Sequence, residues 1–197
     1  MQESYETLLL KRPQDHVLQI TINRPERRNA MNTQLGRDML DIFSTFLLDP
    51  GDTRTVIITG AGDKAFCAGG DLKEREGMTD EEWRLQHVIF EQAIYHVIDC
   101  PVPVIAAVNG SAFGGGCELA LAADFIYATE SARFALTEIT LGIIPGCGGT
   151  QNLPRAAGSR RAKEILYTGA PFTAAEGLEW CICLLYTSDA ADEGLGV

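Results

Sequence analysis

Positive charge is scarce in this sequence: 16 lysine and arginine residues stand against 27 aspartate and glutamate residues, a net charge of −11 over 197 residues. That balance argues against a general affinity for nucleic acids or anionic membranes, which are themselves negatively charged. Long apolar runs are also missing, and the first residues show no basic flank followed by an apolar core and a cleavage site. We therefore expect a cytoplasmic protein that binds neither nucleic acid nor membrane.

Metal-binding and nucleotide-binding patterns are absent as well. The six cysteines form no CxxC pair and lie among apolar neighbours, and there are only three histidines. This is unlike a zinc ligand set or a secreted disulfide framework, and it favours buried free thiols. The sequence has neither GxxxxGK[ST] nor a correctly spaced GxGxxG after a strand, which disfavours a P-loop or a Rossmann fingerprint.

Strand and helix patterns alternate along the chain. "VLQITI" (17–22) and "TVIITG" (55–60) are typical of buried strands, and between them lies an apolar stripe at helical spacing that Asn32 or Thr33 can cap. A second helix is expected near Thr79, which forms a capping-box pattern with Glu82. The alternation predicts an α/β protein.

The later part of the chain continues this order. "VPVIAAVNG" is strand-like, "GGCELALAAD" helical and "FIYAT" strand-like, and a last helix is expected that Ser159 could cap and Gly169 could close. We find no internal sequence repeat at a fixed period and no linker, so one compact domain over residues 1–182 is preferred.

Residues 183–197 form a different kind of segment. "CLLYTSDAADEGLGV" follows the helix start "TAAEGLEW" abruptly and has no capping pattern of its own. It resembles translated sequencing adapter, so we expect a non-native tail after a protein that is truncated at its C-terminus near Ile182. The alternative is a naturally divergent tail.

Two glycine-rich segments carry the candidate chemistry. In "GSAFGGGCELAL" (110–121) three glycines lead into Glu118 and an apolar helix, whose first N–H groups could serve an oxyanion. "AFCAGGDLKE" (65–74) offers a second donor beside Asp71. Taken singly, such glycines are often simple bends, Glu118 could be a carboxylate stabilised by the dipole of its own helix, and Glu138 could be a surface residue.

The combination of segments is more specific. "NRPERRNAMN" (23–32), "AFCAGGDLKE", "AVNGSAFGGGCELALAAD" (107–124) and "LTEITLGIIPGCGGTQNLPR" (136–155) occur in this order. Together they resemble the enoyl-CoA hydratase/isomerase (crotonase) superfamily, closest to the hydratases. The resemblance implies a spiral of ββα units, here without its C-terminal helical segment.

The resemblance also implies the catalytic groups. The N–H groups of Gly70 and Gly115 would form an oxyanion hole for an acyl-thioester carbonyl. Glu118 and Glu138 match the two glutamates of the hydratases, with Glu118 as the water activator and Glu138 as the proton donor at C2. Hydration of a 2-trans-enoyl-CoA to a 3-hydroxyacyl-CoA, or the reverse, needs such a carboxylate pair.

Further expectations follow from the same resemblance. Residues that match the binding of the CoA portion and the closure of the acyl pocket are Arg28, Ala30, Ala68, Asp71, Leu72, Lys73 and Gly146. The protein would be a lyase of fatty acid metabolism that uses an acyl-CoA substrate, no metal and no cofactor, and full-length relatives would form trimers or dimers of trimers. Two alternatives stay open: an isomerase that moves the double bond, and an inactive fragment that only binds CoA.

Overall fold

The fold is built on two β-sheets. The structure, a computed structural model, describes residues 4–187. The larger sheet has six strands in the order β1 (Leu8–Lys11), β2 (Val17–Ile22), β3 (Thr55–Gly60), β5 (Val104–Val108), β7 (Phe125–Thr129) and β10 (Leu185–Thr187). The smaller sheet has four short strands in the order β4 (Ala65–Cys67), β6 (Ser111–Phe113), β8 (Arg133–Ala135) and β9 (Phe172–Thr173).

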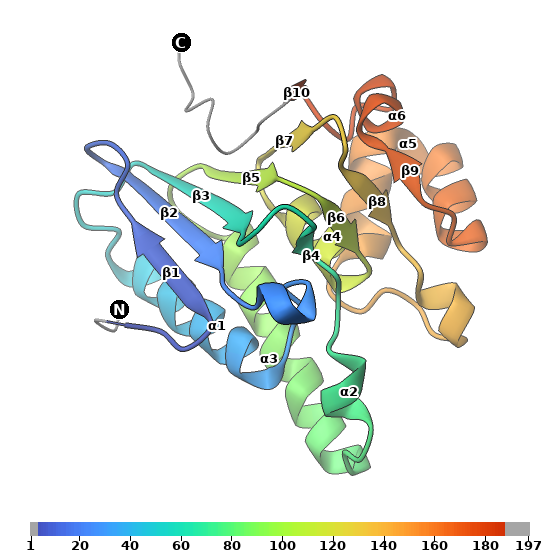
Figure 1. Cartoon of the computed structure of the whole chain (residues 1–197), viewed down its shortest axis with the longest axis horizontal. Helices are drawn as coiled ribbons and strands as arrows, with labels where there is room; N and C mark the ends of the chain where they lie inside the picture. Colours follow the sequence, from blue (N-terminus) through green and yellow to red (C-terminus); the bar gives the residue numbers. More distant parts are fainter. Residues whose placement is uncertain (1–3, 188–197) are drawn as a thin grey trace.

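A strand, strand, helix unit recurs along the chain. Its first strand (β3, β5 or β7) joins the large sheet, its second strand (β4, β6 or β8) joins the small sheet, and a helical segment follows (Figure 1). The helices are α1 (Thr33–Leu48), α2 (Leu72–Arg75), α3 (Asp80–Ile98), α4 (Gly115–Ala122), α5 (Gly149–Thr168) and α6 (Ala174–Glu179), with short 3-10 turns at Pro25–Arg27 and Glu138–Leu141. The expected α/β spiral of ββα units is confirmed.

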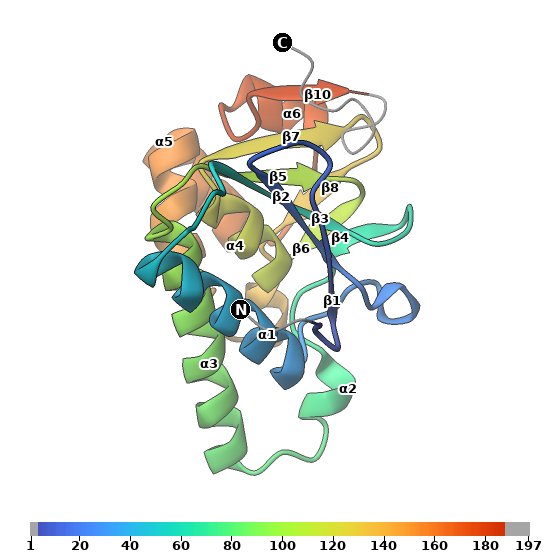
Figure 2. The same ribbon diagram turned by 90° about the vertical axis from the view of Figure 1, so that its left-hand side faces the viewer.

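Helices α1 and α3 lie together on one side of the large sheet, and α4 lies at the centre of the molecule (Figures 1 and 2). The apolar stripe of α1 explains its orientation, because Leu35, Ile42 and Phe43 are at most 1% exposed and form part of the core. Burial of such side chains is the main stabilising term for a helix in a folded protein. Because α3 packs on α1, the burial of α1 in the core also determines how α3 is oriented.

The expected helix starts agree with the structure in two cases. Asn32 caps α1 by accepting a hydrogen bond from the Leu35 N–H at 3.0 Å. Thr79 and Glu82 form the capping box of α3, with the Thr79 N–H donating to Glu82 Oε2 at 2.8 Å. Side-chain caps of this kind satisfy N–H groups that have no partner inside the helix.

The last long helix begins earlier than the sequence predicts. Helix α5 starts at Gly149 and is interrupted at Gly158, which has φ 74° and ψ 157°, so Ser159 opens only its second part. Gly169 ends the helix in the left-handed region at φ 62°, as expected. The early start matters for function, because it places a helix N-terminus beside the glycine-rich turn at 145–149.

The proposed boundary at residue 182 falls inside a region with contacts to the core. Cys183 is 1% exposed, and β10 pairs in parallel with β7. The division into a 1–182 domain and a 183–197 tail stays a prediction, and residues 188–197 lie outside the described part. Within residues 4–187, the helices are too short or too polar to cross a bilayer.

Candidate active site

The carboxyl ends of three adjacent parallel strands converge on one place. Strands β4, β6 and β8 are neighbours in the small sheet and run in the same direction. The chain leaves β4 toward Gly70, leaves β6 toward Gly115 and leaves β8 toward Glu138. Ligands of α/β proteins commonly bind beyond the carboxyl ends of parallel strands, where the chain must turn and its polar groups are free.

A cavity of about 700 Å³ opens at this place. It is lined by seven of the residues that the sequence analysis selected: Ala68, Gly70, Leu72, Gly115, Glu118, Glu138 and Gly146. One wall is apolar, formed by Met31, Trp83, Phe90, Leu141, Ile143 and Ile144. The cavity thus combines a polar, glycine-lined end with an apolar region that can accept a hydrocarbon chain.

The two glycine segments touch each other. A Cβ on Gly69 would lie 3.4 Å from the Gly115 nitrogen and 2.7 Å from the Phe113 carbonyl oxygen. Gly115 is the first residue of α4, where backbone N–H groups have no partner inside the helix. The Gly70 N–H donates to no group within residues 4–187, whereas its neighbour Asp71 donates to the Met31 carbonyl at 2.9 Å. Two candidate oxyanion donors are therefore brought together.

The three glycines at 114–116 have different structural roles. Gly114 adopts φ 51° and ψ −125°, a conformation that side chains disfavour. A Cβ on Gly116 would lie 2.0 Å from the Cys67 carbonyl oxygen, so Gly116 is required for α4 to approach β4. Gly115 lines the cavity, and the nearest atom to a Cβ there is Met31 Sδ at 3.3 Å. A side chain at Gly115 would therefore be directed at a ligand more than at the protein.

Glu118 is a buried carboxylate that the backbone holds in place. Its side chain is 2% exposed, and Oε1 accepts hydrogen bonds from the N–H groups of Cys147 at 2.7 Å and Gly149 at 2.8 Å. Gly149 is the first residue of α5, so Glu118 faces the N-terminus of a helix other than its own. Burial is the largest influence and raises the pKa of Glu118 to about 7, although the two N–H donors oppose it.

Glu138 faces the same space with a free oxygen. Its side chain is 9% exposed, so it is not the surface residue that the alternative interpretation describes. Oε2 is buried without a hydrogen-bond partner among the described residues, and Oε1 lies 3.2 Å from where a Cβ of Gly114 would be. Burial raises the pKa of Glu138 above its ordinary value. The carboxyl group is therefore positioned to exchange a proton with a ligand beside Gly115.

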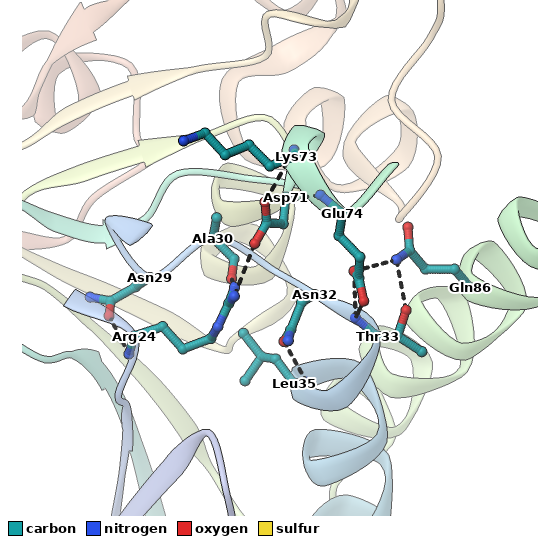
Figure 3. Close-up of polar contacts among 10 residues, drawn as sticks. All are labelled: Arg24, Asn29, Ala30, Asn32, Thr33, Leu35, Asp71, Lys73, Glu74 and Gln86. Carbon is teal, nitrogen blue, oxygen red and sulfur yellow. Dashed lines mark hydrogen bonds and ion pairs between the residues drawn. The ribbon is translucent and has the colours of Figure 1, made fainter. Parts of the chain in front are cut away.

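The segments expected to bind CoA lie side by side along one edge of the site. Met31 and Gly70 form a parallel bridge, and the Ala68 N–H donates to the Arg28 carbonyl at 3.1 Å. Asp71 is paired with Arg24 at 2.9 Å and caps α2 through the Lys73 and Glu74 N–H groups (Figure 3). The Arg24 pairing helps to lower the pKa of Asp71, against the largest influence, which is its burial.

Four of the predicted substrate-binding residues do not line the cavity: Arg28, Ala30, Asp71 and Lys73. Arg28 and Lys73 are exposed beside it, and the carbonyl of Ala30 accepts a hydrogen bond from the Arg24 guanidinium (Figure 3). Asp71 and Ala30 thus have structural contacts in this protein.

The polar residues that α2 and α3 contribute to the cavity were not predicted from the sequence. Arg75, His87 and Glu91 line the cavity, and the His87 Nε2 lies 3.4 Å from Glu91 Oε1. Trp83 stacks on the His87 ring with centroids 5.3 Å apart. The spacing of 83, 87 and 91 marks one face of a helix, but nothing in that spacing says that the face meets a cavity. Among residues 4–187 there is no cluster of three or more metal-ligating side chains.

The comparisons with known proteins identify the family of this chain. The sequence model of the enoyl-CoA hydratase/isomerase family matches residues 12–190. The chain belongs to the enoyl-CoA hydratase/isomerase family. It is 46% identical over 175 residues to the family protein YngF of Bacillus subtilis (strain 168), and 40% identical over 174 residues to a crotonyl-CoA hydratase of Syntrophomonas wolfei.

The fold has a close counterpart among solved structures. The crystal structure of an enoyl-CoA hydratase from Bacillus anthracis superposes with a TM-score of 0.90 at 44% identity, over 92% of this chain and 70% of that one. The two curated relatives are matched over 88% of this chain, which spans 66% of the length of each of them.

Proposed function

We propose that the protein adds water across the C2=C3 bond of a 2-trans-enoyl-CoA to give a 3-hydroxyacyl-CoA, or catalyses the reverse dehydration. The observation that carries this proposal is the presence of two buried glutamates, Glu118 and Glu138, in the cavity that Gly70 and Gly115 also line. Hydration needs one proton to leave water and one to reach C2, which is a task for paired carboxyl groups.

Glu118 is the proposed base. It takes a proton from a water molecule whose oxygen attacks C3, while its Oε1 stays fixed by the N–H groups of Cys147 and Gly149. Glu138 is the proposed acid and donates its proton to C2. The pKa of Glu118, raised to about 7 by burial, keeps its proton exchange accessible near neutral pH, and burial raises the pKa of Glu138 as well, which favours its protonated form.

The N–H groups of Gly70 and Gly115 are the proposed oxyanion hole. Addition of water at C3 places negative charge on the thioester oxygen before C2 is protonated. Two fixed N–H donors stabilise that charge, and loss of one such donor typically costs about 3 kcal/mol in the transition state. The segments at 28–31 and 68–73 are the proposed contacts of the CoA portion at the rim.

The reaction so written consumes only water and thioester, so we propose no metal or cofactor beyond the coenzyme A of the substrate. We also propose a role in fatty acid metabolism, and trimers or dimers of trimers for chains of the full length of its relatives. Isomerisation of the double bond is the second candidate, because the family includes isomerases and one carboxyl group could move a proton between C2 and C4.

Product analysis separates these reactions. The protein is incubated with crotonyl-CoA in water enriched in heavy oxygen, and the thioesters are analysed by mass spectrometry. We expect 3-hydroxybutyryl-CoA that carries one heavy oxygen. A 3-enoyl-CoA given to the same protein tests the alternative. Its conversion to the 2-enoyl isomer would show that the protein is an isomerase, provided that the products of neither thioester contain heavy oxygen from the water.

A further inference from the structure

Arg75 is a cation inside the cavity. It is the last residue of α2, and its guanidinium carbon and Nη1 both lie 3.0 Å from where a Cβ of Gly70 would be. The same guanidinium lies over the Phe90 ring, 5.8 Å from the ring centroid. Arg75 thus stands between the proposed oxyanion donor and the apolar wall where the acyl chain would lie.

The neighbouring residues fix the Arg75 side chain without neutralising it. Its Nε donates to Gln86 Oε1 at 2.8 Å. Gln86 is 1% exposed and donates in turn to Thr33 Oγ1 and Glu74 Oε2, both at 2.8 Å (Figure 3). A half-buried arginine held by a fully buried amide loses little further freedom when it binds a ligand.

The terminal N–H groups of Arg75 remain available to hydrogen-bond a ligand. Within residues 4–187 no carboxylate lies within 4.0 Å of this guanidinium, whereas Arg24 is paired with Asp71 at 2.9 Å. Glu91, which also lines the cavity, has His87 as its partner. An arginine that is partly removed from water needs an anion or hydrogen-bond acceptors to offset the loss of hydration.

A carboxylate is the group that matches these donors. Arginine binds carboxylates through two parallel N–H···O bonds, which are stronger than bonds between neutral groups. The thioester carbonyl at Gly70 would be followed by C2 and C3 beside the glutamates, and the chain would then run past Arg75 along the apolar wall. A saturated hydrocarbon end would leave the guanidinium donors unpaired, and a terminal carboxylate would satisfy them.

We propose that Arg75 makes this protein selective for acyl-CoA thioesters whose acyl chain ends in a carboxylate. The proposal rests on the proposed function for the orientation of the thioester. It names Arg75 as a specificity residue of that reaction, and Gln86 as the residue that positions it.

Binding of saturated thioesters tests this selectivity without any turnover. Glutaryl-CoA and valeryl-CoA have acyl chains of equal length that differ in a terminal carboxylate or methyl group, and adipyl-CoA and hexanoyl-CoA form a second pair. Calorimetry on the wild-type protein is expected to show about 10- to 100-fold tighter binding of the carboxylated member in at least one pair, as for hydrogen bonds between charged groups.

Variants test whether the preference for carboxylated thioesters depends on the guanidinium group of Arg75. Arg75→Gln is expected to remove the preference and leave the affinity for the methyl-ended thioester within about twofold, and Arg75→Lys to keep only part of it, since lysine has no planar fork. Arg84→Gln, an equal loss of charge on the exposed side of α3, is expected to leave the preference unchanged. Thermal unfolding of each variant checks that the fold is retained.

Two results would overturn the proposal. One is equal binding of both members in both pairs. The other is an equal loss for all thioesters and for free coenzyme A in Arg75→Gln, which would place Arg75 on the phosphates or in the fold. A carboxylate preference in binding, together with no hydration of any enoyl-CoA, would support the Arg75 site and contradict the proposed reaction, so the two failures are distinguishable.

Discussion

Glu118 and Glu138 are chemically alike, but the protein gives them different surroundings. Glu118 has two backbone N–H donors on one oxygen, which orient it and leave its other oxygen for a water molecule. Glu138 has a buried oxygen without a partner among the described residues, as expected of a group that exchanges a proton with a ligand. The sequence singles out Glu118 by the glycines and the apolar helix around it, but it marks Glu138 only through the resemblance to a family.

Replacement of Glu118 tests the proposed base. Glu118→Gln keeps the shape and an acceptor oxygen for the Cys147 and Gly149 N–H groups, but it cannot take a proton from water. We expect kcat to fall by at least about a hundredfold, with little change in the affinity for saturated acyl-CoA. Glu130→Gln, at an exposed position, serves as the control. Near-normal turnover by Glu118→Gln would rule out the assigned role.

The same variant should change stability in a pH-dependent way. The pKa of Glu118 is raised to about 7 from an ordinary 4.5, so the folded protein keeps a proton that the unfolded chain loses as the pH rises. Stability is then lost between about pH 4.5 and 7, by an amount on the order of 3 kcal/mol for a shift of this size.

Glutamine is neutral at every pH and avoids this loss. We therefore expect the Tm of Glu118→Gln to exceed that of the wild type at pH 8, and the difference to shrink toward pH 5, measured by differential scanning calorimetry. A difference in Tm that is the same at both pH values would argue against a raised pKa.

At the scale of elements, the long strands and helices could be predicted but the small sheet could not. The apolar runs at 17–22 and 55–60 and the caps at Asn32 and Thr79 are local signals, and the structure confirms them. Strands β4, β6 and β8 have three residues each, too few for a period-2 pattern to be recognised. The early start of α5 was missed because glycines precede it in place of a side-chain cap.

Helix α4 depends on two adjacent glycines in different ways. Gly116→Ala would place a Cβ 2.0 Å from the Cys67 carbonyl oxygen and should force β4 and α4 apart, at a cost of about 1–3 kcal/mol or more. The methyl group of Gly115→Ala would lie 3.3 Å from Met31 Sδ and 4.0 Å from the Gly69 Cα, so this variant should fold with its methyl group in the cavity.

Urea unfolding and enzyme assays compare the two variants. We expect Gly116→Ala to lose stability, and Gly115→Ala to keep most of its stability but lose activity. A fully active Gly115→Ala would contradict the placement of the thioester against this residue.

At the scale of the whole molecule, the face of α3 that lines the cavity could not be read from the sequence. The orientation of α3 is set by its packing on α1, and only the folded chain shows that this face of α3 and the loop after Glu138 line the same cavity. His87 thereby becomes part of the site, together with Arg75 at the end of α2, which Gln86 of α3 holds by a hydrogen bond. Several large apolar side chains near this loop are exposed: Ile139 at 47%, Leu141 at 58%, Ile143 at 45% and Ile144 at 76%.

These exposed side chains predict how the 197-residue chain behaves in solution. Apolar patches of several hundred Å² on a monomer favour association, so we expect this chain to bind a hydrophobic dye, to elute heterogeneously and to be poorly active. Size-exclusion chromatography coupled to light scattering measures the oligomeric state and the homogeneity of the chain. A homogeneous and fully active trimer of the 197-residue chain would contradict this expectation.

The central claim is that one thioester binds across the cavity, with its carbonyl on two N–H groups and its C2 and C3 atoms beside two glutamates. A crystal structure of the protein with valeryl-CoA, a saturated thioester that cannot be hydrated, tests it most directly. We predict the carbonyl oxygen within about 2.7–3.1 Å of both the Gly70 and the Gly115 nitrogen, with the C2–C3 bond facing Glu118 and Glu138. A thioester bound outside this cavity, or one whose carbonyl meets neither nitrogen, would contradict the account.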